Sequence, residues 1–162
     1  MPIAPTDWNP LFSTGAEVAA SLTGLVFVGI SINLKNVVST PGLPARAAES
    51  VAHLFLILLV CLLMLVPGET THVLGDATLV LGVLWWIVVT FLHWRRFQIF
   101  PFGPRLLSGA ILGQLDALCI LIGGYRLATG HVDGYLWIAA AFAFALIAGV
   151  VGAWVLLIEI LR

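Results

Sequence analysis

The sequence predicts an all-α polytopic membrane protein with five transmembrane helices, and three observations carry this prediction. Of its 162 residues, 61% are apolar and 9% are charged, against about 45–50% and about 25% in average soluble domains. Five apolar runs reach the roughly 20 residues that a helix needs to cross a hydrocarbon core of about 30 Å. Six of the seven Lys and Arg residues then fall on one side of those runs, which indicates a fixed orientation.

The first three predicted spans are bounded by local signals. The first opens with the capping-box pattern of residues 14–17 (TGAE). The second follows the Pro/Gly-rich stretch 39–44 and ends at Pro67-Gly68, and the third ends before Arg95. We expect these spans at about 15–36, 45–66 and 73–94.

The last two spans complete a single transmembrane domain over residues 1–162. A Pro/Phe-rich turn at residues 100–104 separates the third span from the fourth, expected at about 105–128. The fifth, about 134–161, carries no charge between Asp133 and Glu159. We expect no cleavable signal peptide, because no basic region precedes the first apolar run.

The basic residues predict the direction of the spans. With the N-terminus outside and the C-terminus in the cytoplasm, Arg126 alone lies outside, and short connections let the positive-inside rule apply. The cations on the cytoplasmic side are then Lys35, Arg46, Arg95, Arg96, Arg105 and Arg162.

Several function classes lack support. A net charge of −1 provides no basic surface for nucleic acid. The two cysteines fall in separate spans without a CxxC motif, so no disulfide framework is expected. No HExxH, GxSxG, P-loop or dinucleotide motif occurs, and the connections are too short for a soluble active site. We therefore expect neither an enzyme nor a bound cofactor.

Ionisable side chains inside the spans are the candidate functional residues, because each is costly in lipid. Asp116 is the deepest acid, near the middle of the fourth span, with Gln114 as a neutral companion. His53 has a similar depth in the second span and could partner Asp116, with Glu49 one turn away on the same helical face. Asp116 is then a structural acid, a proton or cation site, or, if the span is tilted, an acid in a wet crevice with no role. Glu49 and His53 form a structural pair, a proton relay or, with ligands from elsewhere, a metal site.

His93 is expected at the inner surface. It precedes residues 94–96 (WRR), where aromatic rings and cations meet headgroups. This position implies a depth different from that of His53, so the two imidazoles would not share a haem. At the outer surface, Trp8 and Tyr135 are expected to act as interfacial anchors.

The first span carries a polar stripe at 4-3-4-3-4 spacing. Either the stripe is a close-packed seam between helices, or it lines an aqueous path with an acid and a base at its two ends. Its members are Glu17, Ser21, Gly24, Val28, Ser31 and Lys35.

Small residues at helical spacing predict helix packing, because they let helix backbones approach closely. Gly109 and Gly113 lie on the face of the fourth span that holds Asp116. Ala145 and Gly149 repeat this spacing in the fifth span, and Gly24 belongs to the stripe of the first.

Three stretches resemble a group of small bacterial membrane proteins, some of which are labelled predicted modulators of a membrane-anchored AAA protease. They are residues 22–34 (LTGLVFVGISINL), 46–49 (RAAE) and 65–69 (LVPGE), all in the first half of the chain. The resemblance implies a multi-pass protein of the bacterial inner membrane. It assigns no functional residue.

These observations lead to two functional expectations. The first is a homo-oligomeric channel or transporter-like protein for cations or protons, with its path along the polar stripe and past Glu49, His53 and Asp116. The alternative is a non-conducting structural or regulatory protein that contacts a membrane-protein partner through its small-residue faces.

Overall fold

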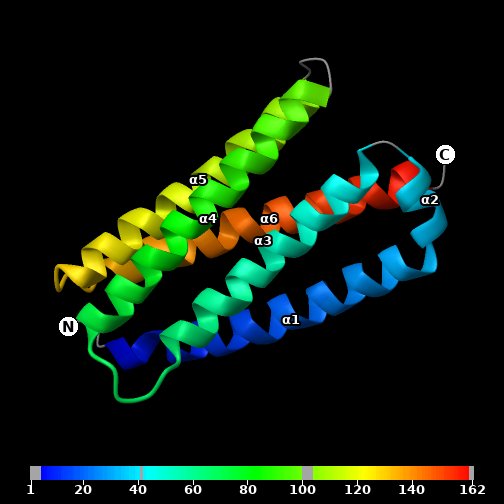
Figure 1. Cartoon of the computed structure of the whole chain (residues 1–162). Coiled ribbons are helices and arrows are strands. Elements are labelled where there is room, and N and C mark those ends of the chain that lie inside the picture. Colours follow the sequence, from blue (N-terminus) through cyan, green and yellow to red (C-terminus); the bar gives the residue numbers. More distant parts are fainter. Residues whose placement is uncertain (1–4, 41, 100–103, 161–162) are drawn as a thin grey trace.

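The computed structural model describes the backbone of residues 5–40, 42–99 and 104–160, and the side chains of 7–40, 42–95, 98 and 110–154. Its segments are helices joined by short connections (Figure 1). In chain order they are η1 (Pro5–Trp8), α1 (Asn9–Ile32), α2 (Leu34–Ser39), α3 (Leu43–Met64), α4 (Thr71–Ile99), α5 (Pro104–Ala128) and α6 (Gly134–Ile160).

Five helices are long and apolar enough to cross a bilayer, which confirms the predicted helical membrane protein. The start of α1 and the end of α6 lie at opposite ends of the bundle, as an odd number of crossings requires (Figure 1). Which end faces the cytoplasm remains a prediction from the basic residues. The candidate spans are Asn9–Ile32, Leu43–Met64, Thr71–Arg95, Ala110–Ala128 and Gly134–Trp154.

Helix α3 is the centre of the bundle. It contacts α1, α6 and, over a shorter stretch, α4, while α5 packs between α4 and α6. In the most apolar window of α3, 56% of residues are buried, compared with 11% in that of α1. Helix α1 is therefore peripheral, with most of its surface left to lipid or to another chain.

Helix α1 begins earlier than the capping-box pattern predicted. It starts at Asn9, so residues 14–17 lie inside the helix and that prediction is wrong. Pro10 suits a first helical turn, and aromatic packing holds the start in place. Trp8 stacks on Tyr135 with ring centroids 5.9 Å apart, and buried Phe12 lies 6.1 Å from the same ring. Tyr135 is thus buried between α1 and α6 instead of anchoring at the lipid interface.

Glycines bring α4, α5 and α6 into close contact. A side chain at Gly75 of α4 would collide with the backbone of Ala128 in α5. A Cβ atom at Gly124 would lie 2.8 Å from the backbone nitrogen of Leu79. These positions let α4 and α5 approach until backbone meets backbone, as small residues do at membrane helix interfaces.

A tight connection joins α5 to α6. Gly130 adopts φ +83°, a left-handed conformation that favours glycine. Arg126 donates to both carboxylate oxygens of Asp133, with Nε 3.1 Å from Oδ1. These hydrogen bonds are the main reason that the pKa of Asp133 lies below its usual value, and the positive charge of Arg126 lowers it further.

We expect Arg126→Gln to raise the pKa of Asp133 towards the ordinary value of about 3.9. Because the folded-state pKa is lowered, the ionised carboxylate stabilises the fold at pH values above the unfolded pKa. That contribution is lost as pH falls through the lowered pKa. NMR titration of a ¹³C-labelled aspartate carboxyl in wild type and variant measures the shift. An unchanged midpoint would contradict the ion pair.

Candidate functional site

Four ionisable side chains are buried together at membrane depth, where α3 meets α4 and α5. Their exposed fractions are 9% for Glu49, 2% for His53, 5% for His93 and 0% for Asp116. Charged side chains are almost never buried without a partner. Here they form two carboxylate–imidazole pairs.

The first pair, His53 and Asp116, joins α3 to α5, and we call it the inner pair because it lies further from the start of α3 than the second pair does. Nε2 of His53 lies 3.4 Å from Oδ2 of Asp116, so the structure places together two residues whose depths suggested contact. The indole of Trp85 on α4 donates from Nε1 to Oδ1 of Asp116 at 3.2 Å. The same indole packs edge-to-face on His53, with ring centroids 5.0 Å apart. Three helices therefore fix this pair.

The second pair joins α3 to α4. Nε2 of His93 lies 3.1 Å from Oε1 of Glu49. His93 is thus buried, and its expected position at the headgroup surface is wrong. Residue Glu49 follows the start of α3 at Leu43 by six positions, and His93 precedes the end of α4 at Ile99 by six, so their depths match. Because α4 continues for six residues beyond His93, this residue lies inside the bundle and not at its end.

Glu49 and His53, expected to pair along one helical face, make a different contact. Nδ1 of His53 lies 2.8 Å from the backbone oxygen of Glu49. The Glu49 carboxylate instead contacts His93. The i, i+4 spacing therefore orients the His53 ring through the backbone.

Gly113 of α5 brings the two pairs to one point. A Cβ atom built there would lie 2.9 Å from Cε1 of His93 and 3.3 Å from Nε2 of His53. The expectation that the two histidines lie at different depths is therefore wrong. Any side chain at Gly113 would displace the imidazole of His93 and crowd that of His53, because contacts this short are tighter than atoms normally allow.

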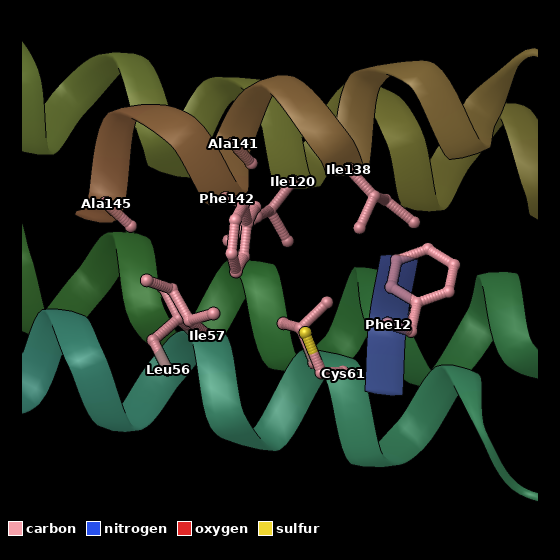
Figure 2. A pocket seen from close by; sticks show the side chains of 10 residues that line it. Phe12, Leu56, Ile57, Cys61, Ile120, Ile138, Ala141, Phe142 and Ala145 are labelled. Carbon is pink, nitrogen blue, oxygen red and sulfur yellow. The ribbon is translucent and has the colours of Figure 1, made fainter. Parts of the chain in front are cut away.

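An apolar layer follows the polar cluster in the direction of the α3–α4 connection. Ile57 lies one turn beyond His53, and Ile120 one turn beyond Asp116; both are buried. They line a small cavity together with Cys61 and Ile138 (Figure 2). Among the described residues, the buried carboxylates and imidazoles therefore extend from the end where α3 begins only as far as Asp116, and the buried polar side chain beyond them is the hydroxyl of Thr78.

Gln114 lies on a different face of α5. Its Oε1 accepts from the Trp86 indole at 2.9 Å, and its Nε2 donates to Oγ1 of Thr90 at 3.2 Å. Both polar ends are thus bound to α4 on a partly exposed surface. Gln114 cross-links the two helices and does not join the buried pairs.

The polar stripe faces away from the bundle, and it is divided between two helices, because α1 ends at Ile32 and Lys35 lies on α2. All six positions, from Glu17 to Lys35, are exposed. A Cβ atom added at Gly24 would have no atom of another helix within 4 Å, and the Ser31 hydroxyl donates to the backbone oxygen of Phe27. Within one chain the stripe, including Ser21, neither packs against another helix nor joins the buried cluster. A helix seam or an aqueous path along the stripe would require a second chain.

The remaining small residues have separate places. Ala145 is buried in the core, and a Cβ atom at Gly149 would lie 2.8 Å from Cγ of Leu54, so α6 approaches α3 closely there. Gly113 packs against the histidines. The surroundings of Gly109 lie outside the side chains that the structure describes.

The donor set does not suit a metal ion. In the part of the chain that the structure describes, no three His, Cys, Asp or Glu side chains are arranged to hold one. Three buried polar atoms lack a hydrogen-bond partner among the described residues, namely His53 Nε2, His93 Nδ1 and Asp116 Oδ2. Two of these atoms face each other in the inner pair, so the arrangement is suited to exchanging a proton.

Comparison with known protein families, curated proteins and solved structures finds no match to this chain.

Proposed function

We propose that this membrane protein translocates protons or monovalent cations, as a channel or transporter. The observation that carries the proposal is the meeting of two buried carboxylate–imidazole pairs at Gly113, inside membrane-spanning helices. An ionisable group at the centre of a membrane helix costs about 2.5–3.5 kcal/mol even on the gentler scale. Buried ion pairs are also poor stabilisers compared with apolar packing. Four such groups in one cluster therefore favour a role in handling ions.

In this proposal the ion enters where α3 begins. It meets Glu49 and His93 first, passes Gly113, and reaches His53 and Asp116. Crossing the layer at Ile57 and Ile120 completes the transfer and requires a change from the conformation described above, because that layer is apolar. The path lies within α3, α4 and α5, and the stripe of α1 would contribute only where subunits meet in a homo-oligomer. The family resemblance supports a bacterial inner membrane as the setting.

The test is ion flux through purified protein in liposomes, measured with pH- and cation-sensitive dyes. We expect wild type to conduct and Gly113→Ala to reduce the flux at least about tenfold, because its methyl group displaces the imidazole of His93 and crowds that of His53, and a shift of about 1 Å can cost a hundredfold in transfer rate. Gly29→Ala is the matched control, since its methyl group meets no other helix and Gly29 lies outside the polar stripe.

Two results would overturn this function. One is a wild-type protein that is folded in the liposomes but passes no ion at any pH or voltage. The other is equal flux in wild type and Gly113→Ala, which would place the path elsewhere.

The second candidate is a non-conducting protein that binds a membrane-protein partner. The exposed stripe favours it, because Glu17 on α1 and Lys35 on α2 are exposed and have no described contact within the bundle that would explain a polar face there. Co-purification of one specific membrane protein in fixed stoichiometry, lost on replacing Ser21 and Ser31 with Leu, would support this role.

A further inference from the structure

We infer that the ion handled by the buried cluster is the proton, and that the His53–Asp116 pair holds one transferable proton at a time. The inference rests on the proposed function and specifies its substrate. It follows from the hydrogen bonds that surround the pair.

A hydrogen bond at Nδ1, the ring nitrogen that does not face Asp116, fixes the tautomer of His53. Nδ1 lies 2.8 Å from the backbone oxygen of Glu49. A carbonyl oxygen only accepts hydrogen bonds, so Nδ1 must carry a proton. In neutral His53, Nε2 then holds the lone pair, and this is the atom that faces Asp116.

Asp116 is fixed in a corresponding way. The Trp85 indole nitrogen is a donor only, so Oδ1 of Asp116 acts as an acceptor at 3.2 Å. A proton on Asp116 therefore resides on Oδ2. Oδ2 lies 3.4 Å from Nε2 of His53.

Two acceptor atoms thus face each other, and one proton between them satisfies both. With that proton on Oδ2, the pair is a neutral carboxylic acid and a neutral imidazole. Transfer breaks the Oδ2–H bond and forms an Nε2–H bond, which gives carboxylate and imidazolium. Neither form changes the net charge of the pair, so the proton can be held without an added counter-ion. An approach of about 0.5 Å would bring the two atoms to ordinary hydrogen-bond distance.

The surrounding groups favour a proton over a metal cation. Hard cations prefer several oxygen ligands, whereas the unpartnered atoms here are two imidazole nitrogens and one carboxylate oxygen. Of the side chains that the structure describes, the titratable groups near the pair are His93 from α4, the Glu49 carboxylate of α3 that contacts His93, and Cys119 from α5. The described part of α6 has no acidic or basic side chain beyond Tyr135, which lies towards its other end. Within the described side chains, Glu49 and His93 therefore form the neighbouring pair that can supply or accept the proton.

Solid-state ¹⁵N NMR of histidine-labelled protein in lipid tests this inference directly. The His53 signals are assigned by their loss in His53→Gln. We expect Nδ1 to remain protonated throughout a pH titration, while Nε2 changes between the bare and the protonated form. In Asp116→Asn the side-chain amide can accept from Trp85 and donate to Nε2, so Nε2 should stay bare where it changes in wild type. Asp76→Asn, which alters an exposed carboxylate, should leave the His53 signals unchanged.

A neutral His53 with a bare Nδ1, or an Nε2 titration that persists unchanged in Asp116→Asn, would overturn the one-proton pair. Flux of Na⁺ or K⁺ without proton flux would also overturn it, yet leave the proposed function standing. Absence of all ion flux alongside the expected NMR behaviour would instead reject the proposed function and retain the pair as a proton-binding site. The two failures are therefore distinguishable.

Discussion

Asp116→Asn is expected to reduce proton flux in liposomes to the level of protein-free vesicles. An amide has the shape of the carboxylate but cannot bind and release a proton at neutral pH. The hydrogen bond from Trp85 can persist in the variant, and an N–H group can face Nε2 of His53. The fold should therefore survive, so the loss would be one of proton transfer. Dye-reported acidification under an imposed potential measures it.

Asp76→Asn is the matched control for this experiment. It makes the same chemical change at an exposed carboxylate near the start of α4, and its flux should equal that of wild type. Equal flux in Asp116→Asn and wild type would show that protons cross by another route. Aggregation of Asp116→Asn would shift the test to Trp85→Phe, which removes the donor to Asp116 and keeps an aromatic ring beside His53; unaltered flux in that variant would count against the site.

The second large effect is expected on stability from Gly75→Ala. Its Cβ atom would overlap the backbone of Ala128, and no side-chain rotation can relieve a clash with backbone atoms. Helices α4 and α5 must separate, which costs about 1–3 kcal/mol by analogy with overpacked cores. Thermal unfolding in detergent, followed by tryptophan fluorescence, measures the loss.

Gly29→Ala provides the opposite result at a second helical glycine, which lies outside the polar stripe. Its methyl group meets no other helix, and alanine favours helix over glycine by about 1 kcal/mol. We expect unchanged or slightly raised stability. If both variants unfold alike, the close α4–α5 approach is not what Gly75 provides.

Hydropathy predicted the five spans because a helix satisfies its own backbone hydrogen bonds in lipid. Whether it can cross then depends on a long apolar run with few charges, which local composition shows. Helix boundaries were harder, because tertiary contacts extend them. The capping-box pattern at residues 14–17 is a valid local signal. It is overridden because Phe12 and Trp8 pack on Tyr135, which is distant in sequence.

The candidate site was predictable in part. Equal depth suggested the contact between His53 and Asp116. The partner of Glu49 was missed because His93 precedes a run of aromatic and basic residues, which suggested the surface, while α4 in fact continues to Ile99. Glu49 lies as far from the start of α3 as His93 lies from the end of α4, so the pair could have been identified once the end of α4 was known. Sequence spacing could not show that Trp85 faces Asp116 while Trp86 faces outward, because α4 is apolar around its whole circumference.

The apolar layer at Ile57 and Ile120 has an electrical consequence. A voltage across layers in series falls mainly over the layer with the lowest dielectric constant. Moving one elementary charge through 100 mV takes about 2.3 kcal/mol of work. In the proposed mechanism, occupancy of Asp116 would follow the acidity of one compartment with little influence from voltage. The hop past the two isoleucines would bear most of the field. This apolar barrier, which continues through Val60 and Met64 of α3, would then limit the current.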